Sequence, residues 1–378
     1  MPVVLESADH MTATPSVLLR IVNRVAILKL NRPMVLNALS NEMVLNLTAA
    51  LDRCRMDEQV VAVALVGAGE KAFCAGGDIR ELHQYAVTKD RRWQKLLVDE
   101  YRLDYAIHNY PKPIIALLNG IVMGSGMGLA QGAWLRVATE RTTMAMPQTR
   151  IGLVPDFGAT YFMAQMPIEI QLYLALTGTA LGGADAIFCN LADVYAPANW
   201  LMQFEERLKR VTSIALNPAF PDQLKRTLRE IFQPSTFSMP APAIRDSVPL
   251  IKHYFGSDST VSDIIHNLTQ GLEHYKSGEA KRWIGETLEA LKQHSPTMLC
   301  VAREAMLRGR KMTLAECMRM ELGIISQVIE EGDFLDGVRA HLIEKDRKPR
   351  WTPATICEVR KERVRYILSN PWLQKERR

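Results

Sequence analysis

The stretch that decides the fold is KAFCAGGDIR, residues 71–80. An uncharged, β-branched run over 60–66 comes before it, and an apolar pattern of helical period over about 78–86 overlaps its end. This order predicts a buried strand, a tight turn and a helix. At the turn, Gly76 and Gly77 let the backbone approach a ligand, and the first N–H groups of the helix have no intrahelical partner. Such donors can stabilise a developing oxyanion, although a plain strand-to-helix turn explains the same pattern.

A second turn of the same kind follows in NGIVMGSGMG, residues 119–128. The buried run at 114–118 predicts a strand before it, and the pattern at about 125–133 predicts a helix after it. One such turn is common in proteins. Two of them, some 48 residues apart, favour a pair of backbone donors that converge from neighbouring crossovers. The structural alternative is close helix packing permitted by glycine.

Outward from these turns, the pattern alternates strands with helices. Two apolar runs over 17–31 predict a hairpin, and Ser40 is placed to cap a helix over about 42–55. We interpret 67–77 as a loop and 92–109 as a helix. This alternation is the signature of parallel crossover units with helices on the sheet, so the predicted fold class is α/β.

Beyond about residue 200 the strand signals fade, and apolar residues recur every three or four positions. The second half of the chain is therefore predicted to be mostly helical. The predicted organisation is an N-terminal extension (1–16), an α/β core (17–200), a helical C-terminal region that closes over the core (201–350) and a basic tail (351–378).

Two polar side chains lie eight residues apart in the loop-like segment MPQTRIGLVPDFG, residues 146–158. They are Gln148 and Asp156, surrounded by prolines and glycines. An aspartate that follows proline is usually a turn or cap residue, so the spacing alone does not assign chemistry.

Composition limits the class of protein. The 378 residues are 48% apolar and 23% charged, as in ordinary globular proteins. The six cysteines form no CxxC pair and are expected to be free thiols, and no histidines have metal-ligand spacing, so no metal is expected. No secretory signal is visible, and the uncharged run 113–135 contains too many glycines and polar residues for a membrane span.

The net charge of +5 is concentrated at the C-terminal end. Residues 351–378 contain seven Lys or Arg and three Glu, a local excess of four positive charges. A solvated, helix-prone tail explains this composition. The functional alternative is a contact with phosphate, RNA or an acidic partner.

At this point a resemblance emerges over about residues 17–355. Five separated blocks resemble, in order, the signature segments of the crotonase superfamily: LNRPMVLNALS, KAFCAGGDIR, NGIVMGSGMGL, MPQTRIGLVPDFG and DFLDGVRAHLIEKDRKPRW. DEYRLDYAIHNYPKP and SPTMLCVAREAMLRG resemble its 3-hydroxyisobutyryl-CoA hydrolase branch in particular. The resemblance implies a spiral of ββα units with C-terminal helices, and an acyl-CoA thioester as the ligand. No further cofactor is expected.

The resemblance also assigns roles to the two glycine-rich turns. The oxyanion donors become the backbone N–H groups of Gly77 and Ser125, with Gly76 and Gly124 beside the substrate. The family usually has glycine where this chain has Ser125. Serine keeps the N–H donor, but its hydroxyl adds volume to the pocket.

Further roles carry over to charged residues. Glu100 and Asp156 match acidic positions that line the substrate pocket, and Asp156 is expected near the 3-hydroxyl of the substrate. Arg32, Lys71 and Arg80 are candidates for the phosphates of CoA.

Gln148 departs from the family pattern. The hydrolase branch has a catalytic glutamate there, which acts as general base or nucleophile. A carboxylate can accept a proton, whereas a primary amide cannot usefully do so. The loss of a positioned base costs about 10²- to 10⁴-fold in rate. The substitution indicates either a variant enzyme that positions water through the amide or a binding fold without turnover.

Three functions compete. The favoured interpretation is a catalytically weak fold retained in the small subunit of the mitochondrial ribosome, with ribosomal proteins and rRNA as partners of the basic tail. The alternative is an active 3-hydroxyisobutyryl-CoA hydrolase of valine breakdown. A hydratase or isomerase is third, because Gly128 stands where hydratases carry a second glutamate. A mitochondrial location is expected from the resemblance.

Overall fold

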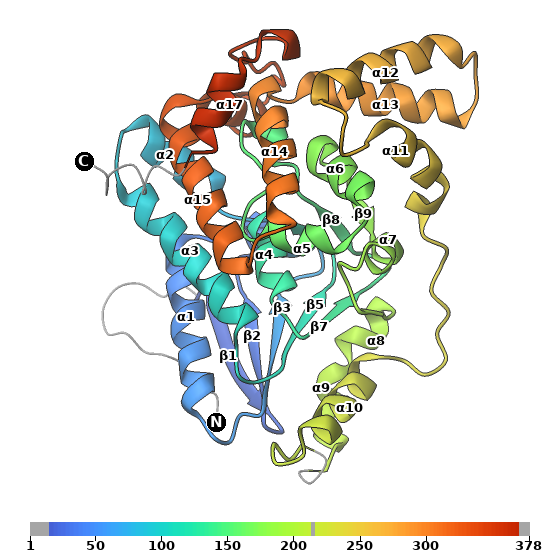
Figure 1. The fold of residues 1–378 in the computed structure, drawn as a ribbon. Coiled ribbons are helices and arrows are strands. Elements are labelled where there is room, and N and C mark those ends of the chain that lie inside the picture. The colour runs from blue at the N-terminus through green and yellow to red at the C-terminus, as the bar shows by residue number, and fades with distance from the viewer. Residues whose placement is uncertain (1–14, 213–215, 370–378) are drawn as a thin grey trace. The chain divides into compact units, whose positions relative to one another are not determined.

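The computed structural model describes residues 15–212 and 216–369. Contacts within the chain divide it into two compact units, each made of three separated segments. Figure 1 labels the helices and strands along the chain. Unit 1 comprises Met1–Gly77, Arg102–Met144 and Leu181–Pro242, and unit 2 comprises Asp78–Tyr101, Ala145–Ala180 and Ala243–Arg378. The boundaries predicted near residues 200 and 350 divide the chain in sequence order and stay a prediction.

The main sheet of unit 1 has six strands. In sheet order they are β1 (Val17–Val22), β2 (Val25–Leu30), β3 (Ala62–Gly67), β5 (Ile114–Leu118), β7 (Leu135–Ala138) and β10 (Val194–Tyr195). The first two form the predicted antiparallel hairpin, and every later pairing is parallel. The predicted α/β class with parallel crossovers is therefore confirmed.

A second sheet of four short strands was not predicted. It contains β4 (Ala72–Cys74), β6 (Ile121–Met123), β8 (Thr143–Ala145) and β9 (Leu181–Gly182). The prediction that 67–77 is entirely a loop is wrong, because β4 lies inside it. A strand of three residues is too short to show an alternating pattern, and the adjacent glycines dominated the interpretation.

Helices of unit 1 cover its main sheet. Ser40 caps α1 as predicted, since its side chain accepts a hydrogen bond from the N–H of Met43. The helices of this unit are α1 (Asn41–Met56), α4 (Ser125–Gln131), α7 (Gly183–Phe188), α8 (Ala198–Met202), α9 (Phe204–Arg210) and α10 (Pro221–Phe232), and α3 (Arg92–His108) begins in unit 2 and ends in unit 1.

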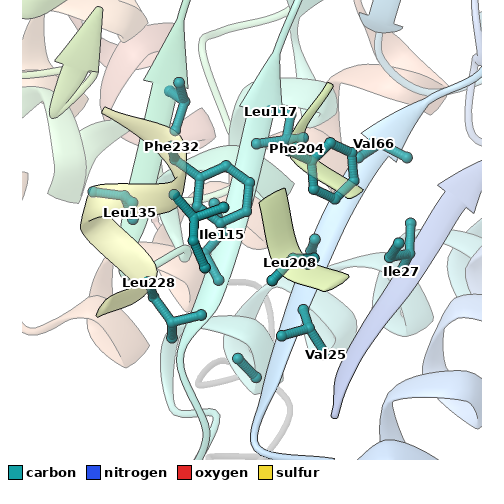
Figure 2. Packing of buried hydrophobic residues seen from close by; sticks show 14 of the residues in the cluster. Val25, Ile27, Val66, Ile115, Leu117, Leu135, Phe204, Leu208, Leu228 and Phe232 are labelled. Carbon is teal, nitrogen blue, oxygen red and sulfur yellow. The ribbon is translucent and has the colours of Figure 1, made fainter. Parts of the chain in front are cut away.

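One face of the main sheet packs against α9 and α10 (Figure 2). Alternate strand residues point to this face, as the two-residue period of a strand requires. Because the strands are in register, these side chains form a continuous apolar layer under Phe204, Leu208 and Phe232. The labelled residues of the layer include Val25, Ile27, Val66, Ile115, Leu117 and Leu135.

Unit 2 is largely helical, as predicted for the second half of the chain. Its α-helices are α2 (Ile79–Val87), α5 (Ala159–Phe162), α6 (Ile168–Thr177), α11 (Val248–Tyr254), α12 (Val261–His274), α13 (Glu279–Gln293), α14 (Pro296–Gly309), α15 (Leu314–Glu331), α16 (Phe334–Val338) and α17 (Lys361–Ile367). A 3-10 helix, η2, spans Gln148–Ile151. Among the described helices, none combines the length and apolar content that crossing a membrane requires.

Aromatic side chains join several helices within unit 2. Tyr173 stacks on Trp283 with ring centroids 5.5 Å apart, and it meets Phe255 edge-on at 5.3 Å. Helices α12 and α13 lie side by side and are seen in the same region of Figure 1. The segment 218–260, where the residue pattern is weakest, holds α10, a short 3-10 helix (Ala243–Ser247) and α11.

Candidate active site

The two glycine-rich turns of unit 1 follow strands that pair with each other. β4 and β6 are parallel neighbours, with Ala72 opposite Ile121 and Cys74 opposite Val122. The carboxyl ends of parallel strands meet at one edge of a sheet, so the turns that follow them share that edge. The predicted convergence of the two turns therefore has a structural basis within this unit.

Glycine is required at two places where the turns meet. Gly76 has φ +107°, and a Cβ there would lie 3.0 Å from the carbonyl oxygen of Met123. A Cβ on Gly126 would lie 2.3 Å from the carbonyl oxygen of Cys74, which no side chain tolerates. The backbone of each turn thus touches the strand that precedes the other turn, and Gly77 and Ser125 are held in this contact region.

Ser125 is the first residue of α4, and Gly124 before it has φ 53°. The serine is buried, at 1% exposure. Its N–H is one of the helix-start donors that have no intrahelical acceptor. Its hydroxyl has no hydrogen-bond partner in the described part of the chain. A buried hydroxyl usually has a partner, so an enclosed, unpartnered one marks a place where a polar ligand atom can bind.

In unit 2, Gln148 and Asp156 are in direct contact. The side-chain nitrogen Nε2 of Gln148 donates a hydrogen bond to Oδ1 of Asp156 at 3.0 Å. Both side chains are buried. The other end of the amide, Oε1 of Gln148, has no partner among the described residues. The family resemblance assigned each of these residues to the site separately, and the structure places them in hydrogen-bond contact.

Burial controls the protonation of Asp156. It raises the pKa of this carboxyl well above its ordinary value, and the nearby carboxylates of Glu321 and Glu100 raise it further. The hydrogen bond from Gln148 acts in the opposite direction but is a smaller effect. The folded protein therefore keeps Asp156 protonated over a wider pH range than an exposed aspartate.

The turn after Asp156 is held by Glu321, a residue that was not among the site residues expected from the sequence. The carboxylate of Glu321 accepts hydrogen bonds from the N–H of Gly158 at 2.7 Å and from the N–H and hydroxyl of Thr160 at 2.8 and 2.6 Å. Gly158 has φ +86° and is the N-cap residue of α5, so these bonds satisfy donors at a helix start. Burial raises the pKa of Glu321 to about 7.

A signal for Glu321 was present in the sequence. In α15 the residue lies four positions after Cys317 and four before Ile325, and all three are completely buried. A charged residue in register with an apolar helical stripe must bury its charge, so it needs partners. The partners, however, come from a segment more than 160 residues earlier, which the pattern does not reveal.

Glu100 lies in the part of α3 that belongs to unit 2 and is 1% exposed. It contributes to the raised pKa of Asp156, which places the two carboxyls in one electrostatic environment. Three buried acidic residues of unit 2 are thus coupled: Glu100, Asp156 and Glu321.

The three basic residues proposed for CoA phosphates do not form one cluster in either unit. Arg32 donates to the carbonyl oxygen of Ala38 at 2.6 Å in unit 1, where Lys71 is exposed. Arg80 belongs to unit 2 and donates to the carbonyl oxygen of Leu342 at 2.9 Å. Their assignment to phosphates stays a prediction.

The candidate residues thus form two sets. Unit 1 holds the oxyanion candidates Gly77 and Ser125, and unit 2 holds Gln148, Asp156 and Glu100. Within the residues that the structure describes, no group of three or more His, Cys, Asp or Glu is arranged to hold a metal ion.

The fold and these motifs define a family. The chain matches the enoyl-CoA hydratase/isomerase model over residues 25–368, and it belongs to that family. It is 35% identical to the mitochondrial 3-hydroxyisobutyryl-CoA hydrolase of Bos taurus, over 95% of this chain and 89% of the relative. It is 34% identical to 3-hydroxyisobutyryl-CoA hydrolase 1 of Arabidopsis thaliana, over 94% of this chain and 92% of the relative.

Solved structures agree on the fold. An enoyl-CoA hydratase from Rhodobacter sphaeroides is 32% identical and superposes with a TM-score of 0.80, covering 95% of this chain and 98% of that one. A carnitinyl-CoA dehydratase from Mycobacterium thermoresistibile, also 32% identical, gives 0.81 and covers 94% and 96%. The resemblance to the crotonase superfamily and to its 3-hydroxyisobutyryl-CoA hydrolases is therefore confirmed.

Proposed function

We propose that this chain binds 3-hydroxyisobutyryl-CoA and hydrolyses it slowly to 3-hydroxyisobutyrate and CoA. The similarity to hydrolases over nearly the whole chain supports the substrate class. The observation that carries the low rate is the hydrogen bond from Gln148 to Asp156. This bond commits the amide nitrogen of Gln148 to the Asp156 carboxyl. Because residue 148 is glutamine, no carboxylate stands at the position where the hydrolase branch has its base.

The reaction needs two kinds of group. Water attacks the thioester carbonyl carbon, the carbon–sulfur bond breaks, and the proton lost by water is finally taken by the departing CoA thiolate. The carbonyl oxygen becomes negative on the way, and N–H donors such as those of Gly77 and Ser125 stabilise that charge. A base must remove the proton of the attacking water.

Neither side chain of the Gln148–Asp156 pair is well suited to act as the base. An amide oxygen is a weak proton acceptor, although Oε1 of Gln148 can hold a water by a hydrogen bond. Asp156 could accept a proton only after it ionises, and burial opposes its ionisation by raising its pKa. The weak basicity of the Gln148 amide and the raised pKa of Asp156 together predict slow hydrolysis. The rate of hydrolysis should rise with pH as Asp156 loses its proton.

The test is the hydrolysis of 3-hydroxyisobutyryl-CoA by wild type and by Gln148→Glu, followed by release of the CoA thiol. Restoring the carboxylate is expected to raise kcat by about 10²- to 10⁴-fold. Gln148→Ala is the matched control, because it removes the amide without adding a base, and it should not accelerate hydrolysis. Rapid turnover by wild type, or equal rates in wild type and Gln148→Glu, would contradict the proposal.

A second candidate function is the ribosomal role predicted from the tail. The observation that favours it is the exposure of basic side chains on and beside α17, where Arg360, Lys361 and Arg365 are exposed while Val364 and Ile367 are buried. Lys375, Arg377 and Arg378 of the same predicted tail lie outside the described residues. This arrangement leaves a positively charged surface free for an acidic partner or RNA.

Sedimentation of cell extract separates the two candidates. A ribosomal component migrates with the small subunit at low salt and stays there at moderate salt. A free enzyme remains at the top of the gradient, as the hydrolase proposal predicts. The location belongs to the same proposal: several hydrolase relatives are named as mitochondrial, which favours mitochondria, and fractionation of source cells tests it.

A further inference from the structure

Unit 1 contains an open cleft at the amino ends of β3 and β5, with a volume of about 680 Å³. Val60 and Val61, which precede β3, and Pro113, which precedes β5, form part of its wall. Further prolines line it from the segments before β5 and α10. Because proline fixes its own φ, these walls are preorganised rather than adaptable.

The lining of this cleft is strongly basic. Four cationic side chains line it, together with one carboxylate, that of Glu58. The residues that line the cleft thus carry a formal net charge of +3, whereas the whole chain carries +5. The cations come from four different segments of the sequence: Arg24, Arg55, Lys112 and Lys225.

Two of the cations are held by neutral groups. The ammonium of Lys112 donates to the carbonyl oxygens of Cys54 and Asp57 at 2.6 and 2.8 Å. The guanidinium of Arg24 donates to three carbonyl oxygens, those of Gln59, Leu216 and Glu58, each at 3.2 Å. Within the described residues, neither cation forms an ion pair with a carboxylate. These bonds fix the positions of the charges without neutralising them.

Both cations keep donors for a ligand. A lysine ammonium has three N–H donors and an arginine guanidinium has five, so each retains unused ones. Burial lowers the pKa of Lys112, which shows that its charge has lost some hydration. An anion in the cleft would compensate for that loss.

Helix capping alone does not explain the cluster. Lys112 does stabilise the carboxyl end of α1 through the carbonyl of Cys54, and Arg24 ties down the loop that follows. Lys225 lies within α10 and does not cap a helix end; its ammonium lies 5.9 Å from the ring centre of Trp134. Among the described residues, Arg55 forms an ion pair with Asp52 at the surface, where such a pair contributes little.

The cleft is separate from the glycine-rich turns. It lies at the amino end of β3, whereas Gly67, at the carboxyl end of β3, approaches the backbone of Ala72 in β4. Five steps of about 3.3 Å between its six residues put the two ends of β3 roughly 17 Å apart. An anion in the cleft would therefore not occupy the position expected for the thioester group.

We propose that this cleft is a binding site for a small phosphate-bearing anion. A phosphate group accepts several hydrogen bonds at once and carries up to two negative charges, which suits converging Lys and Arg donors better than a single carboxylate does. The proline walls offer apolar contact to an organic part of the ligand. The site is independent of the proposed hydrolase function.

The test is isothermal titration of the full chain with inorganic phosphate, pyrophosphate and phenyl phosphate, at low and moderate salt. Pyrophosphate and phenyl phosphate are expected to bind saturably, and more weakly as salt rises. Phenyl phosphate should bind more tightly than inorganic phosphate, because the apolar wall contacts its ring.

Charge reversal at Lys225 and Arg55 tests the cleft. Arg24 and Lys112 are left unchanged, because their hydrogen bonds to backbone carbonyls also stabilise the fold. Lys225→Glu and Arg55→Glu each reverse one charge of the cleft and should weaken pyrophosphate binding about tenfold. Arg226→Glu is the matched control: it lies next to Lys225 on α10, is exposed and does not line the cleft. Its effect should be less than about threefold, because its charge acts only through solvent.

Two results would overturn the proposal. One is the absence of saturable binding by pyrophosphate and phenyl phosphate in the millimolar range. The other is equal weakening by Lys225→Glu and Arg226→Glu, which would indicate diffuse attraction to the surface instead of a site. Thermal melting of each variant confirms that it is folded before titration, and Arg55→Glu decides the matter if Lys225→Glu is unstable.

Discussion

Glu321 accepts three hydrogen bonds from the turn that follows Asp156, and it does so where water has no access. The bonds favour the ionised carboxylate, whereas burial favours the neutral acid. Burial is the larger effect, because the pKa is raised to about 7 from an ordinary 4.5. The residue thus stabilises the shape of the turn and, at neutral pH, lies close to its own titration point.

This balance makes stability depend on pH. A carboxyl whose pKa is raised in the folded state contributes stability that is complete below about pH 4.5 and is lost as pH rises through about 7. The shift corresponds to on the order of 3 kcal/mol in the free energy of unfolding. Glu321→Gln, which cannot ionise, should show a smaller loss of stability between about pH 5 and pH 8 than wild type in urea unfolding.

Glu286→Gln serves as the control, since it removes an exposed carboxylate from α13. It should follow the pH dependence of wild type. If Glu321→Gln also follows wild type, Glu321 does not titrate in this window. The raised pKa of Asp156 acts in the same direction, so some pH dependence should remain in the variant.

Several individual residues of the candidate site could be predicted from the sequence. Gln148 and Asp156 were assigned to the site by the family resemblance, and the structure joins them by a hydrogen bond. The unpaired hydroxyl of Ser125 and the role of Glu321 were not predicted. Both depend on which distant segments surround a buried polar atom, and one-dimensional patterns contain no such information.

Glycines lie where elements pack closely, but the space around them differs. Gly126 and Gly285 illustrate the two extremes. Gly126 in α4 lies against the carbonyl of Cys74, with no room for a Cβ. A methyl group added to Gly285 in α13 would have the end of the Leu272 side chain as its nearest neighbour, at 3.6 Å, which is ordinary contact. Neither glycine has a positive φ, so only space distinguishes them.

We therefore expect opposite effects from the same substitution. Gly126→Ala should lower the free energy of unfolding by about 3 kcal/mol, because backbone must move to admit the methyl group. Gly285→Ala should raise it by about 0.5–1 kcal/mol, since alanine favours a helix interior. Urea unfolding of both variants beside wild type tests this. Equal effects of the same sign would show that the approach of α4 to β4 is not a tight one.

Elements with a long periodic pattern were the most predictable. The hairpin, the cap of α1 and strand β5 were all predicted from residue patterns, and they appear where expected. The three-residue strands β4 and β6 were missed. Their pairing is set by the neighbouring strand and not by their own residues, so only the assembled sheet defines them.

On the scale of the whole molecule, contacts group the chain differently from sequence order. The sequence changes character near residue 200, which predicted a boundary there. That boundary stays a prediction, while contacts divide the chain into two units of three segments each, and both units contain residues from the first and second halves. A change from strand to helix pattern marks a change of element type, and it does not show which elements pack together.

The segmented units also have a consequence for synthesis of the chain. In unit 2, His83 of α2 contacts the carbonyl of Leu335, which is 252 residues further on. At roughly 5–20 residues per second, a nascent chain would present α2 for roughly 10–50 seconds before that partner is made. Unit 2 thus cannot complete its packing before Leu335 is made, and until then α2 lacks this partner.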